Sequence, residues 1–173
     1  MGTGKNTTRI LGEFRIENLE NITFKEMTVT NTSHNGCGIR MSNAKVELFD
    51  VALKGCGSAG FFIPDSSSET TFVATRCNFA NSRWGVFIAD GVSAKFNSCL
   101  FHDNSRHGIF GRNSTIHLHG EATAIHSNGN GIYSYDSCKV IIHLPSHHNT
   151  SYNNGGQDRH TEQVGTITNV RVV

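Results

Sequence analysis

Four residues have the side-chain types that proton transfer requires. Arg83, Arg106 and His107 are basic, and Asp90 lies between the two arginines in the sequence. An arginine or an imidazole can take a proton from a carbon next to a carboxylate, if the two groups come within hydrogen-bond reach. Hydrolysis by paired carboxylates is not predicted, because the acidic residues do not cluster and such a pair lies roughly 5–10 Å apart. The four residues are therefore candidates for a proton-transfer site only.

The chain contains 10 histidines, and three of them have a spacing that suits metal binding. His117 and His119 flank an apolar residue, and His143 follows at about the distance at which the sequence repeats. Imidazole is a common ligand of divalent ions. However, no carboxylate shares the register of these histidines, and a solvated polar face is the simpler interpretation. They are candidate ligands, and the sequence predicts no cofactor.

A repeat of about 23 residues must position these side chains. Glycines followed by an apolar residue recur at steps of 22, 25, 23, 23 and 24 residues: Gly38, Gly60, Gly85, Gly108, Gly131 and, more weakly, Gly155. Asparagines precede most of them: Asn35, Asn81, Asn104, Asn128 and Asn154. Five residues after the first five glycines stand Asn43, Asp65, Asp90, Asn113 and Asp136. Asn and Gly favour turns and tolerate left-handed backbone, so we expect corners with stacked asparagines there.

Apolar residues upstream of the glycines predict the strands. They follow spacings of two, three and two in four units: Ile22, Phe24, Met27, Val29; Val46, Leu48, Val51, Leu53; Phe72, Ala74, Cys77, Phe79; and Ala94, Phe96, Cys99, Phe101. A spacing of two is strand alternation, and the step of three indicates a corner. Each unit is then three short strands, and stacked units bury a continuous core.

With this repeat, and with runs such as Asn81 to Ile88 and Asn104 to Gly111, the sequence resembles the right-handed parallel β-helix family, the pectin-lyase-like fold. The resemblance covers about residues 20–161. It implies an all-β solenoid of about six coils, with interior side-chain ladders and asparagine stacks at a corner. A β-propeller or sandwich is the alternative, but propeller blades need about 40 residues each.

Alternation after each glycine separates the inner and outer faces of the predicted coils. If Ile39, Phe61, Val86, Ile109 and Ile132 point inward, the next residues point outward: Arg40, Phe62, Phe87, Phe110 and Tyr133. Trp84, Arg112 and Tyr135 lie beside them on the same coils. Contiguous exposed aromatic residues usually mark a contact surface. The predicted ligand-binding residues are therefore Phe62, Phe87, Phe110, Tyr133, Trp84, Tyr135 and Arg112.

Two kinds of partner suit this face. Aromatic rings beside Arg and Asp suit a linear glycan, whereas the rest of a longer chain or another subunit would cover the face as a protein partner. The coils vary little in length, so the long loops that wall a catalytic groove are not expected. We therefore predict a non-enzymatic structural or recognition module. The alternative is a polysaccharide lyase or an epimerase-like enzyme that uses Arg83, Arg106, His107 and Asp90.

Composition excludes other partners. The 15 Lys and Arg balance 14 Asp and Glu, so no electrostatic footprint for nucleic acid is present. No apolar run approaches the length of a membrane span, so membrane insertion is not predicted. The 5 cysteines show neither a disulfide framework nor zinc spacing, and Cys77 and Cys99 are predicted to be buried as small hydrophobic residues.

The whole chain, residues 1–173, is expected to form one domain. Residues 1–19 would form a partial first coil or cap, 20–161 the regular coils and 162–173 a terminal strand. An open β-helix exposes unpaired strand edges, so self-association or a longer parent chain is expected. Five Asn-x-Ser/Thr sequons weakly favour an extracellular, cell-surface or virion-associated location: Asn6, Asn21, Asn31, Asn113 and Asn149.

Overall fold

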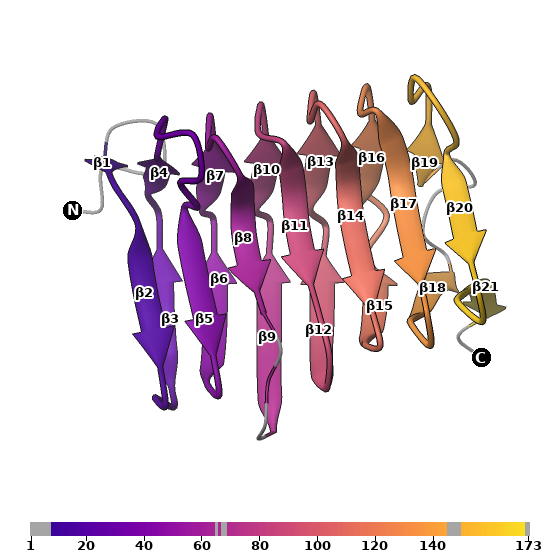
Figure 1. The fold of residues 1–173 in the computed structure, drawn as a ribbon, viewed down its shortest axis with the longest axis horizontal. Coiled ribbons are helices and arrows are strands. Elements are labelled where there is room, and N and C mark those ends of the chain that lie inside the picture. The colour runs from indigo at the N-terminus through magenta and orange to yellow at the C-terminus, as the bar shows by residue number, and fades with distance from the viewer. Residues whose placement is uncertain (1–7, 65, 67–68, 145–149, 172–173) are drawn as a thin grey trace.

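The computed structural model describes residues 8–64, 66, 69–144 and 150–171, and it is a parallel β-helix of three sheets (Figure 1). Asn6, Asp65 and Asn149 lie outside these residues. The first sheet contains β1 (Arg9–Leu11), β4 (Thr28–Thr30), β7 (Ala52–Lys54), β10 (Asn78–Ala80), β13 (Leu100–His102), β16 (Ala124–His126) and β19 (Ser151–Tyr152). The second contains β2 (Phe14–Glu17), β5 (Ile39–Ser42), β8 (Ala59–Ile63), β11 (Trp84–Ile88), β14 (His107–Arg112), β17 (Asn130–Tyr135) and β20 (Arg159–Glu162). The third contains β3 (Ile22–Lys25), β6 (Lys45–Phe49), β9 (Thr70–Thr75), β12 (Val92–Asn97), β15 (Thr115–His119), β18 (Lys139–Leu144) and β21 (Thr166–Arg171).

The all-β solenoid and its repeat are confirmed. All neighbouring strands are parallel, and each coil contributes one strand to each sheet. In the strand register, Arg40 pairs with Phe62 and Tyr133 pairs with His160. The length of one coil therefore varies between 22 and 27 residues. The prediction that the glycine repeat continues at Gly155 is wrong, because the last coil is longer than the others. The residue opposite Ile132 is Arg159, and Gly155 lies in the loop before β20.

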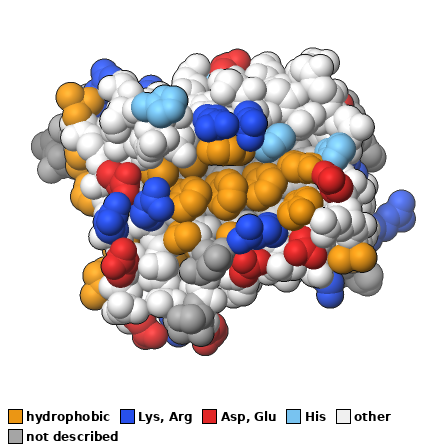
Figure 2. Space-filling view, viewed as in Figure 1, with side chains coloured by type: hydrophobic (Ala, Val, Ile, Leu, Met, Phe, Trp, Pro, Cys, Tyr) orange, Lys and Arg blue, Asp and Glu red, His pale blue; other side chains and the backbone are white. Residues whose placement is uncertain are grey.

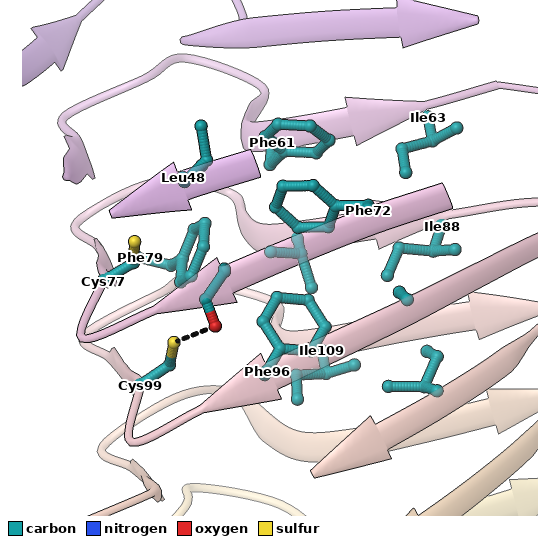
Figure 3. Packing of buried hydrophobic residues seen from close by; sticks show 14 of the residues in the cluster. Leu48, Phe61, Ile63, Phe72, Cys77, Phe79, Ile88, Phe96, Cys99 and Ile109 are labelled. Carbon is teal, nitrogen blue, oxygen red and sulfur yellow. Dashed lines mark hydrogen bonds between the residues drawn. The ribbon is translucent and has the colours of Figure 1, made fainter. Parts of the chain in front are cut away.

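The predicted interior ladders are confirmed by the strand register. Val46 lies opposite Phe72, and Phe72 opposite Ala94, in the third sheet. Phenylalanines from different strands fill the centre of the core; the rings of Phe61 and Phe72, for example, lie 3.9 Å apart between centroids (Figure 3). Apolar burial of this kind is the main force that holds the stacked coils together.

Cys77 and Cys99 occupy equivalent interior positions, as predicted. Both are buried free thiols, and Cys99 Sγ donates a hydrogen bond to the carbonyl of Ala74 at 3.4 Å (Figure 3). Burial raises the pKa of the Cys99 thiol. Since thiolates are the reactive form, this thiol acts as packing material rather than as a nucleophile.

The step of three in the apolar pattern is a sharp corner between the third and first sheets. Its central residues have left-handed backbone on successive coils: Glu26, Asp50, Arg76 and Ser98. Their amides donate to the next coil; Ser98 N, for example, lies 2.9 Å from His119 O. The corner therefore continues the pairing between coils while the chain changes direction.

The repeated glycines serve close approach rather than left-handed turns, which corrects the expectation. Gly38, Gly60, Gly85, Gly108 and Gly131 are not among the residues with positive φ. A Cβ on Gly85 would lie 2.5 Å from the carbonyl oxygen of Gly108, the equivalent glycine of the next coil. Gly60 and Gly108 face the same restriction. A side chain at this position would therefore push adjacent coils apart.

The predicted asparagine stack exists, with different members. The asparagine ladder consists of Asn104, Asn128 and Asn154, in which Asn104 Nδ2 donates to Asn128 Oδ1 at 2.8 Å and Asn128 Nδ2 to Asn154 Oδ1 at 3.0 Å. Asn81 was expected in this stack, but it is a left-handed corner residue, and Ser82 takes the ladder position. Asn35 is exposed and lies outside the ladder.

Strands occur near both ends of the described chain. Residues 1–19 contain β1 and β2, and residues 162–173 contain β21, which continues the third sheet. The described part of the chain contains no helix, and thus none long and apolar enough to cross a membrane.

Candidate functional site

The second sheet carries a row of aromatic side chains on its outer face, and Figure 2 shows this row running across the strands. We call Phe62, Phe87, Phe110 and Tyr133 the aromatic row. Each lies opposite the next in the strand register, and all four are half-buried. Arg40 precedes the row and His160 follows it in the same register. The predicted outward aromatic positions are therefore brought together.

The rings of the row stack on one another. Centroids lie 4.9 Å apart for Phe62 and Phe87 and 4.6 Å apart for Phe87 and Phe110, with planes inclined by 26° and 25°. Tyr133 is tilted by 55° against Phe110. At the other end the guanidinium of Arg40 lies 4.4 Å from the centre of Phe62. The row thus offers mainly ring edges to solvent, because neighbours cover most ring faces.

A second outward column lies at the beginning of the same strands. Trp84, His107 and Asn130 are paired in register, three residues before Phe87, Phe110 and Tyr133. This separation arises because Gly85, Gly108 and Gly131 are buried together with the residue that follows each of them. Regular alternation would turn residues three apart to opposite faces. The glycines therefore place two functional columns on one surface.

Arg83 and Arg106 hold positive charge beside Trp84. Their guanidinium carbons lie 4.5 and 5.6 Å from the indole centre, within the range of cation–π attraction. Within the described residues, neither arginine has a carboxylate within ion-pair distance. Asp103, which lines the same hollow, is hydrogen-bonded to His102. These two arginines therefore place positive charge beside the row.

The proposed catalytic group is not gathered in one place. Arg83, Arg106 and His107 lie at the beginning of β11 and β14. Asp90 follows the other end of β11, where a carboxylate oxygen accepts a hydrogen bond from Arg112 at 2.8 Å. Tyr135 pairs with Arg112 in register and accepts a hydrogen bond from Gln163. Asp90 is thus separated from the bases by the length of a strand.

Two open hollows flank Arg106 along the helix. One of about 870 Å³ is lined by Arg83, Asn81 and Ser105 among others, and one of about 680 Å³ by His107, Tyr133 and Glu162 among others. Both are shallow surface depressions, and no loop of the described residues covers them. Sequence reasoning missed His160 and Glu162 in the second hollow, because its repeat was aligned on Gly155 rather than on the longer final step.

The titratable groups of the second hollow have shifted pKa values. Burial, followed by the charges of Arg106 and His160, lowers the pKa of His107 to about 4. A hydrogen bond to Glu162 raises the pKa of Tyr133 to about 12. At neutral pH both groups are uncharged. His107 is then a weak base, and Tyr133 does not ionise, so neither is matched to proton abstraction near pH 7.

The three candidate metal ligands lie together on the third sheet. His117 and His119 are on β15 and His143 is on β18, where the ring of His143 stacks on that of His119 at 3.9 Å between centroids. One nitrogen of each histidine lies within 4.8 Å of the other two. The predicted neighbourhood of these histidines is therefore present, on a different sheet from the aromatic row.

Comparison with known proteins bears on the fold and not on the ligand. No curated protein and no solved structure matches the chain. The model of the right-handed β-helix region matches residues 12–170, nearly the whole described solenoid. With its three parallel sheets and interior ladders, the chain belongs to the right-handed β-helix family.

Proposed function

We propose that the outer face of the second sheet is a non-enzymatic recognition surface for a linear, anionic glycan. We call this surface, which consists of the aromatic row, the column beginning with Trp84, and Arg83 and Arg106, the recognition face. The observation that carries the proposal is the pair of arginines on successive coils, both without a carboxylate partner among the described residues. Arginine forks suit carboxylate or sulfate groups, which they bind through paired hydrogen bonds.

The repetition of the face favours a polymer as the ligand. Neighbouring strands are spaced by about 4.8 Å, so equivalent groups recur at each coil. A linear glycan presents sugar units and charges at similarly regular intervals along its length. The open hollows suit a chain that lies along the surface, whereas small ligands are usually bound in deeper pockets.

The aromatic row would contribute apolar contact rather than flat stacking. Because each phenylalanine face is covered by its neighbour, or by Arg40 in the case of Phe62, the exposed ring edges form an apolar floor. Charged and amide groups beside this floor, such as Arg106 and Asn130, would then provide the hydrogen bonds. We therefore expect charge to matter more than ring identity for binding.

Binding to a panel of neutral, uronate-containing and sulfated glycans tests the proposal. We expect binding of an acidic glycan, with at least a tenfold loss of affinity in an Arg83→Gln, Arg106→Gln variant. A Lys25→Gln, Lys95→Gln variant is the matched control, because it removes the same charge from the third sheet. Equal affinity in the two variants, or no binding across the panel, would contradict the proposal.

A protein partner is the second candidate, and the apolar ring edges favour it. An exposed apolar row is a common feature of protein interfaces. In that case a Phe87→Ala, Phe110→Ala variant would lose the partner, or self-association, while the arginine variant would retain it. Light scattering of both variants separates this outcome from glycan binding.

A polysaccharide lyase is the enzymatic alternative, since Arg106 and His107 share a hollow with Tyr133. Cleavage by β-elimination would leave an unsaturated sugar that absorbs in the ultraviolet. We expect no such product from polyuronates, because the pKa of His107 is about 4 and that of Tyr133 about 12. Product formation that is lost in His107→Ala would replace the binding proposal with the lyase.

A further inference from the structure

Three histidines converge on the outer surface of the third sheet, away from the recognition face. We call His117, His119 and His143 the histidine cluster. Alternation along β15 places His117 and His119 on the same side of the strand. Since His117 pairs with Ile141 and Leu118 with Ile142, His143 is the neighbour of His119 on the next coil. The stacking of the two rings at 3.9 Å agrees with this register.

The ring nitrogens point toward one another. His117 Nδ1 lies 2.8 Å from His143 Nε2, and ligand nitrogens of all three residues lie within 4.8 Å of one another. Nitrogens bound at about 2.0–2.1 Å in a tetrahedral zinc site are separated by roughly 3.3 Å. Small side-chain rotations would therefore bring the three nitrogens to metal-binding distance. The rigid pairing of β15 with β18 keeps them close without a metal.

We propose that the histidine cluster is a binding site for a divalent transition-metal ion such as Zn²⁺. Three imidazoles from two adjacent coils supply three ligands, and water supplies the remaining position, as at open zinc sites. Imidazole selects borderline ions over Mg²⁺ or Ca²⁺, which prefer oxygen ligands. The ion would link β15 to β18 and thereby stabilise the stacked coils.

The residues around the histidine cluster predict which substitution changes its affinity for the metal. Lys95 lies opposite His117 on the preceding coil and Asn97 opposite His119. On the following coil Val170 lies opposite His143 and Thr168 opposite Ile141. Lys95 is the charged residue among these neighbours, and its ammonium group repels a metal cation. Its removal is therefore expected to tighten binding.

Titration with Zn²⁺ alone, followed by calorimetry, tests the site. We expect one ion per chain, and at least a tenfold loss of affinity in His119→Ala and in His143→Asn. A His102→Ala, His126→Ala variant is the control, because it removes a stacked histidine pair from the first sheet that has no third histidine partner among the described residues. Lys95→Ala is expected to bind at least twofold more tightly.

Thermal unfolding supplies a second measurement. A ligand that binds only the folded state raises the unfolding midpoint. Zn²⁺ should therefore raise the midpoint of the native chain and of the control variant, but not that of His119→Ala. Circular dichroism without metal verifies that each variant folds. Equal Zn²⁺ affinity in the native chain and in both cluster variants, or no binding by the native chain, would overturn the site.

Discussion

Asn128 is a single side chain that satisfies the backbone of several coils. Its amide nitrogen donates to Phe101 O and His126 O at 3.0 and 2.9 Å, and its oxygen accepts from the backbone amide of Asn104 at 3.1 Å. Phe101 and His126 belong to β13 and β16, and Asn104 lies in the buried corner that follows β13. Because an unsatisfied buried polar group is costly, the ladder stabilises this corner.

Replacement of Asn128 by alanine should lower the free energy of unfolding by about 3 kcal/mol, since at least two buried backbone groups lose a partner. Urea unfolding measures this change. Asn128→Ser is the control, because Ser82 fills the equivalent position two coils earlier, where its hydroxyl donates to Ala80 O and accepts from Cys56 N. The serine variant should retain part of the stability. An unaffected alanine variant would show that water replaces the amide.

His107 should make stability depend on pH. Its pKa is about 4 in the folded chain, below the usual 6.5, so the unfolded chain binds more protons between these values. Stability from this group is complete above about pH 6.5 and is lost as the pH falls toward 4. The urea midpoint of unfolding should therefore rise less steeply between pH 4 and pH 7 in His107→Asn than in the native chain. Parallel curves for the two chains would contradict the buried, neutral histidine.

At the scale of the strand, the buried glycines of the second sheet determine how closely successive coils approach and which side chains face outward. Gly85 is followed by buried Val86, so Trp84 and Phe87 both face outward from β11. The same pattern recurs in β14 and β17. Close contact of successive coils at these glycines therefore keeps the aromatic row and the column beginning with Trp84 in line.

Gly85→Ala should destabilise the chain by about 3 kcal/mol, because its Cβ would meet the Gly108 carbonyl at 2.5 Å and the coils would have to separate. Gly155→Ala is the matched control. Its Cβ would have only ordinary contacts at 3.7 Å, and its backbone is not left-handed. Thermal or urea unfolding should show a change within about 0.5 kcal/mol for the control. Similar losses in both variants would contradict the close-approach argument.

At the scale of the whole molecule, the coils form a stack whose last described strand has one open edge. β21 pairs with β18 and lies at the end of the third sheet. Thr166 N donates to Cys138 O, and alternate residues of a strand direct their amides to the same side. The amide of Asn169 therefore points away from β18. Such an edge can accept another strand.

We expect the mass measured by light scattering to rise with protein concentration through this edge, and Asn169→Pro to reduce the rise. Proline removes an amide that the stack does not use, and prolines are tolerated at strand edges for this reason. Thr168→Pro is the control for fold damage, since the Thr168 amide faces β18. A concentration-independent mass for the native chain would exclude pairing through β21.

Much of the fold followed from the periodicity of the sequence. Side chains such as Phe72, Phe96 and Phe101 could be assigned to the interior because every coil repeats the same local pattern, and each local error is corrected by the neighbouring coils. The asparagine ladder was harder to assign. Asn81 and Ser82 are adjacent, and both suit a corner, so only the register of β10 with β13 showed which one faces inward.

The sequence predicted which residues of the candidate site share a face, but it did not predict how their side chains are arranged. Local periodicity determined that Phe62, Phe87, Phe110 and Tyr133 share an outer face and that His143 neighbours His119, because alternation and repeat length depend only on nearby residues. The tertiary structure decided that the rings cover one another, that Asp90 lies apart from His107, and that three imidazoles converge on one point. These features depend on side-chain orientations across different coils, which repeat length alone does not specify.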